Sequence, residues 1–264
     1  MQDWNPDLYR RYEEERTRPA VELLARVPLQ RASLALDLGC GPGNSTELLV
    51  RRFPMAQVLG IDNSPAMVRT AVERVPQARF VLADLAHWES VVPQLPRPDL
   101  IYANAALQWV PDHDRLIPRL FSQLAPSGVL AIQIPDNLDE PTNRLMRQLA
   151  ARAPWDALLR DAGQVRTPLL GVAGYYDLLA RQAATVDVWH TIYQHRMASP
   201  AAIIEWLRAT ALRPFLEPLP AELQEAFIAE YQRMLDGAYP ARADGGRLLA
   251  FPRLFILAQR PAAP

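Results

Sequence analysis

The residues best suited to chemistry are those of a glycine-rich turn and an acidic residue that follows it. The turn is Gly39-Cys40-Gly41-Pro42-Gly43, and it comes directly after the apolar segment 34–38. A second apolar segment, 57–62, ends in Asp62, about 20 residues after the turn. Glycines let the backbone approach a ligand closely, and an acid at this spacing can accept hydrogen bonds from ribose hydroxyls. The pattern predicts a nucleotide-containing ligand at the carboxyl ends of parallel strands.

The details of the turn favour a positively charged ligand over a dinucleotide. The spacing is G-x-G-x-G and not the G-x-G-x-x-G of dinucleotide sites, and Asp37 stands just before the first glycine. Pyrophosphate is an anion, so a carboxylate beside it is unfavourable. S-adenosylmethionine carries a sulfonium and no phosphate, and we therefore expect it as the cofactor. A nicotinamide oxidoreductase is the alternative that the turn and Asp37 disfavour.

Polar residues also stand at the ends of two further predicted strands. Asp84 follows segment 79–83, and Asn104 follows segment 99–103. The carboxyl ends of parallel strands meet at one edge of a sheet, where ligands bind. We expect Asp84 to accept a hydrogen bond from the adenine amino group and Asn104 to offer a carbonyl to the methionyl ammonium. Each of the two residues alone could instead be an ordinary turn residue.

The remaining cofactor residues take roles that follow from the ligand. Asp62 accepts hydrogen bonds from both ribose hydroxyls, and Asp37 favours the sulfonium and ammonium electrostatically. Gly39 and Gly41 let the main chain pass the methionyl portion, and apolar side chains such as Leu85 cover the adenine ring. The complete predicted set is Asp37, Gly39, Gly41, Asp62, Asn63, Met67, Asp84, Leu85 and Asn104.

Alternating strand-like and helical segments must position these residues. Five apolar strands are expected in the first half of the chain, at 34–38, 57–62, 79–83, 99–103 and 129–134. Helices separate them, and Ser64-Pro65 is an N-cap followed by proline at the first helical position. Such alternation predicts an α/β fold with right-handed crossovers. With two late strands at one edge, the expected architecture is a doubly wound, mostly parallel seven-stranded sheet, similar to a Rossmann fold.

Segments outside this core are expected to enclose the site. Residues 1–30 form an N-terminal helical lid, with a helix over 8–27 and a possible break at Pro19. The late strands are 186–193 and 248–258, with an interruption at Pro252. Helices at 200–212 and 221–235 fall in an insertion of about 195–245 on the acceptor side. The whole chain, 1–264, is predicted to be one domain with a cofactor-binding core at 30–135.

Composition restricts the class of protein. The 264 residues have a net charge of −1, which disfavours a nucleic-acid partner. No apolar run approaches the roughly 20 residues needed to span a membrane. The single cysteine lies in the glycine turn, and the start of the chain lacks the features of a signal peptide, so a cytoplasmic location is expected. All 28 basic residues are arginine, which fits either genomic base composition or bidentate recognition of anions.

The motif set resembles a known family. Asp37-Leu38-Gly39-Cys40-Gly41-Pro42-Gly43, Asp62, Asp84 and Asn104 are similar to the motifs of class I S-adenosylmethionine-dependent methyltransferases. A narrower resemblance over nearly the whole chain is to the carboxyl O-methyltransferases that act on trans-aconitate. It rests on segments 4–6, 15–19, 104–113, 175–177, 201–206, 212–214 and 251–255, and Ala211 departs from the glycine expected there. The resemblance implies esterification of one carboxylate to a monomethyl ester.

A carboxylate acceptor needs positioning more than proton transfer. It is already ionised at pH 7, so proximity and orientation carry most of the rate, and neither a catalytic residue nor a metal ligand set is predicted. A tricarboxylate carries about three negative charges at pH 7 and requires cationic partners. The predicted acceptor residues are Arg16, Arg18, Trp109, His195 and Arg213, with Arg196 and Arg253 as weaker candidates. Arg18 and Arg213 are expected to clamp the carboxylates that are not methylated. Each arginine could instead be a solvated surface charge.

Other acceptors and another class of function stay open at this point. The acceptor could be another small carboxylate, a hydroxyl or a carrier-bound malonyl group. A non-catalytic module that binds the cofactor and works through a protein partner is the alternative outside the enzymes.

Overall fold

Apolar segments form a seven-stranded sheet in the computed structural model, which describes residues 13–85, 95–208 and 210–263. The strand order is β3-β2-β1-β4-β5-β7-β6. The strands are β1 (Leu34–Leu38), β2 (Gln57–Asp62), β3 (Arg79–Leu82), β4 (Leu100–Asn104), β5 (Val129–Pro135), β6 (Thr185–Met197) and β7 (Arg247–Gln259). The β1–β2, β1–β4, β2–β3 and β4–β5 pairs are parallel. The predicted fold is confirmed, including the two late strands at one edge.

Helices connect the strands along the chain. Those before β6 are α2 (Glu13–Arg26), α3 (Asn44–Arg52), α4 (Pro65–Arg74), α5 (His113–Gln123), α6 (Pro141–Ala150) and α7 (Gly171–Leu179), with short 3-10 helices η2 (Leu107–Trp109) and η3 (Ala162–Gln164). After β6 come α8 (Pro200–Arg208), α9 (Arg213–Leu216) and α10 (Ala221–Ala238). None of the helices within the described ranges is long and apolar enough to cross a membrane.

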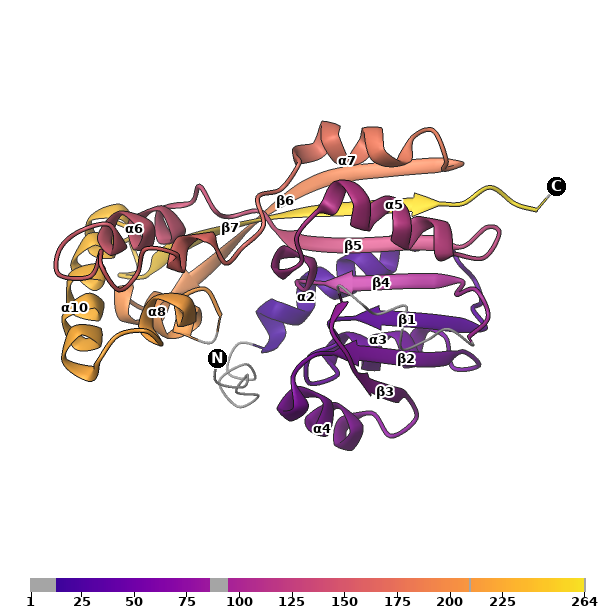
Figure 1. Cartoon of the computed structure of the whole chain (residues 1–264), viewed down its shortest axis with the longest axis horizontal. Coiled ribbons are helices and arrows are strands. Elements are labelled where there is room, and N and C mark those ends of the chain that lie inside the picture. The colour runs from indigo at the N-terminus through magenta and orange to yellow at the C-terminus, as the bar shows by residue number, and fades with distance from the viewer. Residues whose placement is uncertain (1–12, 86–94, 209, 264) are drawn as a thin grey trace. The chain divides into compact units, whose positions relative to one another are not determined.

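The chain divides into two units. The sheet unit is Gln2–Pro135, Leu169–Thr191 and Leu254–Pro264. The helical unit is Asp136–Pro168 with Ile192–Arg253, so it contains the predicted insertion and also the segment that follows β5. Figure 1 shows β3, β2, β1, β4 and β5 side by side in the sheet unit, and α6, α8 and α10 in the helical unit.

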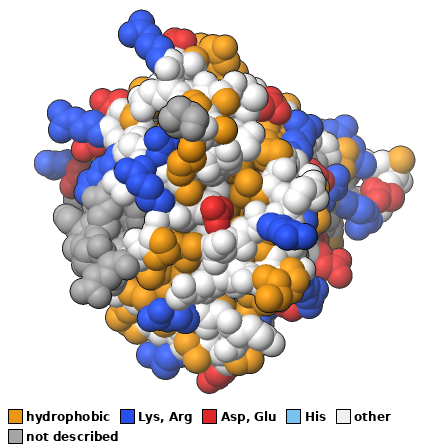
Figure 2. Space-filling view, turned by 90° about the vertical axis from the view of Figure 1, so that its right-hand side faces the viewer, with side chains coloured by type: hydrophobic (Ala, Val, Ile, Leu, Met, Phe, Trp, Pro, Cys, Tyr) orange, Lys and Arg blue, Asp and Glu red, His pale blue; other side chains and the backbone are white. Residues whose placement is uncertain are grey.

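The parallel register brings the polar strand ends to one edge of the sheet unit. Every residue of β1 is buried, and Asp37 pairs with Gly60 on β2 and Tyr102 on β4. Because the strands run in one direction, the glycine turn, Asp62 and Asn104 follow at neighbouring ends. The Tyr102 hydroxyl donates to the Ala20 carbonyl at 2.6 Å, which ties α2 to the sheet. The arginines visible in Figure 2 are spread over several places rather than gathered in one patch.

Three expectations about proline-containing segments need correction. Helix α2 continues through the buried Pro19, and β7 continues through Pro252. Proline lacks an N–H, but the Pro252 carbonyl still accepts a hydrogen bond from Asp136 N at 3.0 Å. The predicted helix 200–212 ends at Arg208, and α9 begins at Arg213 with Pro214 in its first turn. Proline suits that position because the first helical N–H groups have no partner within the helix.

Candidate active site

The glycine turn joins β1 to α3 and has three glycines with positive φ. The φ angles of Gly39, Gly41 and Gly43 are 69°, 54° and 93°, a region that favours glycine. A Cβ on Gly39 would lie 2.2 Å from the Ala106 Cβ, whereas a Cβ on Gly41 would meet no atom within 4 Å. The two glycines therefore differ in role, because Gly39 is required for close packing and Gly41 borders open space that a ligand could use.

Asp62 connects the glycine turn to the start of α4. Its Oδ2 accepts a hydrogen bond from Gly41 N at 2.9 Å, and its Oδ1 accepts one from Ser64 N at 2.9 Å. The Ser64 hydroxyl in turn accepts from Met67 N at 3.2 Å, so the predicted N-cap is confirmed. The two backbone donors hold the carboxylate of Asp62 in one orientation, half-buried at the end of β2.

Asp37 is fully buried beneath the glycine turn. Its Oδ2 accepts hydrogen bonds from the Ser45 hydroxyl at 2.8 Å and the Thr46 hydroxyl at 2.6 Å. Burial raises the pKa of Asp37 to about 6, although the Ser45 and Thr46 hydrogen bonds act to lower it and the charge of Asp62 raises it further. Its Oδ1 is buried and accepts no hydrogen bond from the described residues. Asp37 thus holds the first turn of α3 and places negative charge near the site.

Asn104 ends β4 beside a strained residue. Ala105 has a φ of 55°, which is uncommon for a residue with a side chain, and such strain is found preferentially at functional sites. The Gln108 side chain donates from Nε2 to the Ala105 carbonyl at 2.7 Å and supports this conformation. The side-chain carbonyls of Asn104 and Gln108 are buried and accept no hydrogen bond from the described residues. These two oxygens could accept hydrogen bonds from an ammonium group.

The other predicted cofactor residues fall into a buried and an exposed group. Met67 and Leu85 are buried, and Leu85 belongs to the hydrophobic cluster that includes Ala106. Asp84 and Asn63 are exposed. Asp84 follows β3, which ends at Leu82, so it lies in the loop beyond the strand.

A buried histidine fixes the turn that carries Trp109. One ring nitrogen of His113, Nδ1, lies 2.5 Å from the Tyr175 hydroxyl, and Nε2 lies 2.9 Å from the Leu107 carbonyl in η2. Burial lowers the pKa of His113, although hydrogen bonds with the Leu107 and Val110 backbone act to raise it. The sequence places His113 in a family motif but does not indicate its partner Tyr175, which follows 62 residues later. Trp109 is partly exposed at the end of η2.

The N-terminal helix carries both predicted acceptor arginines of the sheet unit. Arg16 is only 7% exposed, whereas Arg18 has a side chain 66% exposed and pairs with Glu22 at 2.8 Å on the same helix. Residues two positions apart point to different sides of a helix. The geometry favours Arg16 over Arg18 for holding an acceptor carboxylate. The part of the predicted lid at 1–12 lies outside the described residues.

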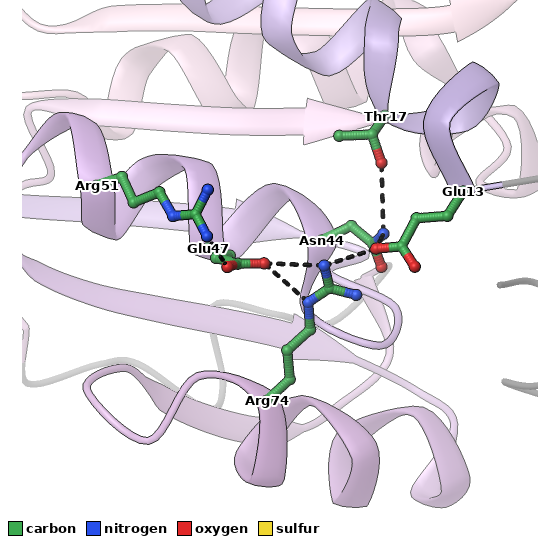
Figure 3. A network of polar contacts seen from close by, with 6 residues as sticks. All are labelled: Glu13, Thr17, Asn44, Glu47, Arg51 and Arg74. Atoms are coloured by element: carbon green, nitrogen blue, oxygen red, sulfur yellow. Dashed lines mark hydrogen bonds and ion pairs between the residues drawn. The ribbon is translucent and has the colours of Figure 1, made fainter.

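A network of charged and polar groups joins α2 to α3 and α4 (Figure 3). The Asn44 amide donates to Glu13 Oε1 at 2.7 Å and to the Thr17 hydroxyl at 3.3 Å. Arg74 contacts Glu13 Oε1 at 2.6 Å and Glu47 Oε2 at 2.8 Å. Burial lowers the pKa of Arg74, but the hydrogen bonds and charges of Glu13 and Glu47 leave it raised overall. Helix α2 is therefore anchored directly beside the glycine turn.

The other predicted acceptor residues belong to the helical unit. Arg213 pairs with Glu217 through contacts of 3.0 and 2.6 Å. His195 is buried against the rings of Tyr193, Trp206 and Phe251. Of the two weaker candidates, Arg196 is exposed and pairs with Asp244. Arg253 is buried, and its guanidinium carbon lies 4.7 Å from the Phe251 ring centroid. The sequence does not predict the burial of Arg253, because residues distant along the chain cover its side chain.

Comparisons with known proteins agree with this fold. A methyltransferase domain model matches residues 9–209. The chain is 66% identical over 262 residues to a trans-aconitate 2-methyltransferase of Variovorax paradoxus (strain S110), covering 99% of this chain and 100% of that relative. Among solved structures, the YcgJ protein of Bacillus subtilis has a TM-score of 0.59 at 17% identity, covering 93% of this chain and 100% of the other. Phosphoethanolamine N-methyltransferase 2 of Haemonchus contortus, in complex with S-adenosyl-L-methionine, has a TM-score of 0.54 at 17% identity. The match covers 92% of this chain and 52% of the other.

Proposed function

Because the chain belongs to the methyltransferase family and shares this identity with trans-aconitate 2-methyltransferases, we propose that it transfers a methyl group from S-adenosylmethionine to a carboxylate of trans-aconitate. The observation that carries the choice of acceptor is the 66% identity over 99% of the chain. The product is a monomethyl ester, with S-adenosylhomocysteine as the second product. A cytoplasmic location and the absence of membrane or nucleic-acid partners stay predictions of the sequence.

The sheet unit supplies the donors and acceptors that S-adenosylmethionine requires. The half-buried carboxylate of Asp62 accepts from the ribose hydroxyls, as an acid at the end of the second strand does in related nucleotide sites. The buried carbonyl of Asn104 accepts from the methionyl ammonium, which satisfies an oxygen that has no donor among the described residues. Gly41 borders the space for the methionyl portion. Asp37, ionised above a pKa of about 6, adds negative charge that favours the sulfonium.

Adenine recognition and the remaining contacts are part of the same proposal. Met67 and Leu85 present apolar surface to the ring faces, and Asp84 accepts from the adenine amino group. Asn63 adds a polar contact at the ribose side. The exposure of Asp84 and Asn63 fits groups that a ligand covers. Leu85 also packs near Gly39, so its position is fixed before the ligand binds.

Transfer of the methyl group requires orientation rather than a base. The sulfonium makes the methyl carbon electrophilic: a carboxylate oxygen forms the new C–O bond as the C–S bond breaks, and the bonding pair stays on sulfur. No proton moves, because the acceptor carboxylate is ionised at pH 7. The chain has to hold that oxygen in line with the methyl group and exclude water. The buried His113 supports this by fixing η2, which carries Trp109.

Cationic side chains compensate the charges of the acceptor. A charge-assisted hydrogen bond to a carboxylate contributes about 1.5–3 kcal/mol. The carboxylates of a tricarboxylate can accept several such bonds. Arg16 supplies a buried guanidinium on α2 of the sheet unit. Arg213 and His195 belong to the helical unit, and their role as acceptor groups stays a prediction of the sequence. Arg18 has the weakest support, because it is exposed and pairs with Glu22.

Methyl transfer from labelled S-adenosylmethionine tests the proposal. The purified chain is incubated with trans-aconitate and, separately, with other di- and tricarboxylates, a hydroxyl acceptor and a malonyl-loaded carrier protein. We expect label in a monomethyl ester of trans-aconitate, with the methylated carboxylate assigned by NMR. Label in another acceptor with none in trans-aconitate would transfer the proposal to that acceptor. Binding of the cofactor without transfer to any acceptor would favour a non-catalytic module.

A further inference from the structure

The side-chain amide of Gln108 has an oxygen without a donor among the described residues. Its Nε2 donates to the Ala105 carbonyl at 2.7 Å. A carbonyl only accepts hydrogen bonds, so the amide nitrogen has to face Ala105, and Oε1 lies on the other side of the amide. Gln108 is 5% exposed, and its Oε1 is buried. Such an oxygen costs free energy unless a ligand supplies a donor.

The turn that carries Gln108 lies against the glycine turn. A Cβ on Gly39 would lie 2.2 Å from the Cβ of Ala106, which stands two positions before Gln108. The Ala105 N–H donates to the Gln133 carbonyl on β5 at 2.9 Å, which joins the turn to the sheet. All of these residues belong to the sheet unit. The oxygen of Gln108 is therefore carried by a segment that borders the predicted methionyl region within one unit.

Buried contacts hold this turn in one conformation. Ala105 has a φ of 55°, and the hydrogen bond from Gln108 supports it. The Leu107 carbonyl lies 2.9 Å from Nε2 of His113, whose Nδ1 lies 2.5 Å from the Tyr175 hydroxyl. Because the carbonyl only accepts, Nε2 donates to it, and in the neutral ring Nδ1 accepts from Tyr175. The Gln108 oxygen is thus presented by a preorganised turn, as a binding group requires.

The surroundings of this turn favour a cationic donor. The side-chain oxygen of Asn104, at the end of β4, is also buried and accepts no hydrogen bond from the part of the chain that the structure describes. The carboxylates of Asp37 and Asp62 lie near the carboxyl ends of the neighbouring strands β1 and β2. An ammonium has three N–H donors and no acceptor, so it can bond to several oxygens and compensate negative charge. The ammonium is the donor group of S-adenosylmethionine that combines both properties.

We propose that Oε1 of Gln108 accepts a hydrogen bond from the methionyl ammonium of S-adenosylmethionine and shares this group with Oδ1 of Asn104. Gln108 is then a cofactor-binding residue to which the sequence motifs assign no role. This role rests on the proposed function, which names the cofactor, and extends it to the recognition of the amino-acid portion. It needs no group from the helical unit.

Three ligands distinguish recognition of the ammonium from a general change of the site. S-adenosylhomocysteine carries the ammonium, its deaminated analogue lacks only that group, and 5′-methylthioadenosine lacks both the amino and the carboxyl group. Titration calorimetry gives the dissociation constant of each ligand for the wild type and for Gln108→Met, which replaces the amide by an apolar chain of similar length. Gln77→Met is the matched control, because Gln77 is exposed in the loop between α4 and β3.

For Gln108→Met we expect the dissociation constant of S-adenosylhomocysteine to rise about tenfold or more, because a hydrogen bond to a charged group is lost. The dissociation constants of the deaminated analogue and of 5′-methylthioadenosine should change by less than about threefold, because neither ligand has the ammonium. A turn that merely loses its shape would weaken all three ligands alike. Gln77→Met should bind all three as the wild type does.

Ala105→Gly separates the donor of Gln108 from its acceptor. Glycine adopts a φ of 55° without strain, so the turn then depends less on the hydrogen bond from Nε2. Adding Gln108→Met to Ala105→Gly should again weaken S-adenosylhomocysteine about tenfold or more, with the other two ligands changed by less than about threefold. This pair decides the matter if Gln108→Met alone does not fold or weakens all three ligands.

Equal losses for the three ligands in the Ala105→Gly background, or no loss for any of them, would overturn the role of Gln108. A wild-type protein that binds neither S-adenosylmethionine nor S-adenosylhomocysteine would defeat the proposed function instead, so the two failures are distinguishable.

Discussion

The carboxylate of Asp62 accepts a hydrogen bond from the backbone N–H of Gly41, with 2.9 Å between Oδ2 and the nitrogen. The acid at the end of β2 thereby sets the conformation of the turn that follows β1. Each carboxylate oxygen can accept more than one hydrogen bond, so Asp62 can hold Gly41 and still accept from a ribose. Substitutions at Asp62 should consequently affect both the shape of the turn and the affinity for the cofactor.

Asp62→Ala should lower the affinity for S-adenosylmethionine by about tenfold to a hundredfold or more, because charge-assisted hydrogen bonds of about 1.5–3 kcal/mol are lost. Asp62→Asn should be intermediate, since it keeps one acceptor oxygen. Titration calorimetry measures both. Asp236→Ala, at an aspartate 63% exposed, is the control. Wild-type affinity in Asp62→Ala would remove the ribose assignment.

Gly39→Ala should destabilise the protein by more than about 3 kcal/mol, because positive φ costs about 1–3 kcal/mol and the new Cβ overlaps Ala106 at 2.2 Å. Gly41→Ala should cost only the backbone strain, because its Cβ meets no atom within 4 Å. Urea unfolding measures the difference. Pairing Gly39→Ala with Ala106→Gly should restore part of the loss. Equal losses at the two glycines would contradict the packing role of Gly39.

Asp37 should make stability fall as the pH rises. Burial raises its folded-state pKa from 3.8 to about 6, so the folded state binds the proton more tightly than the unfolded state. Relative to Asp37→Asn, the wild type should lose about 3 kcal/mol between about pH 4 and pH 7. Denaturant unfolding of both proteins at several pH values tests this. A difference that does not change with pH would show that the carboxylate has an ordinary pKa.

Arg74→Gln should lower the free energy of unfolding by about 1–3 kcal/mol, because Glu13 and Glu47 lose a partly buried partner. Arg51 pairs with the same Glu47 but is 71% exposed, so Arg51→Gln should change stability by less than about 0.5 kcal/mol. Faster amide exchange in α2 should accompany Arg74→Gln, because the network anchors that helix. Similar effects of both substitutions would argue against a special role of Arg74.

Arg16→Gln should raise the KM for trans-aconitate about tenfold or more, whereas Arg18→Gln should raise it less than about threefold. The reason is burial: Arg16 is 7% exposed, and Arg18 is exposed and pairs with Glu22. Steady-state kinetics measures both variants, with calorimetry to confirm unchanged affinity for S-adenosylmethionine. A larger effect of Arg18→Gln would instead favour the predicted contact of Arg18 with an acceptor carboxylate.

Local patterns predict the cofactor side of the site well. Strand boundaries at 34–38 and 57–62 and the N-cap at Ser64 agree with the structure, because apolar runs and cap residues act over a few neighbouring positions. Because Ser64 is the N-cap of α4, the side chain of Asp62 is not needed as the cap. That its partner includes Gly41 N, 21 residues away, is a consequence of the parallel pairing of β1 and β2.

The acceptor side is less predictable, because an arginine looks the same in sequence whether it is buried or solvated. Arg16 and Arg18 lie two positions apart, yet only the first is buried. The contact of His113 with Tyr175 joins residues 62 positions apart. Such contacts depend on how helices pack, which a local pattern does not report.

The sequence by itself therefore determined the sheet, the glycine turn, the acid at Asp62 and the family. These depend on hydrophobic periodicity and on backbone conformations that few residue types allow. Only the tertiary structure decided that Gly39 must accommodate Ala106, that Arg74 joins α2 to α4, and which arginines are buried. Those features arise from contacts between residues distant along the chain, and their energies depend on burial that forms only when the chain folds.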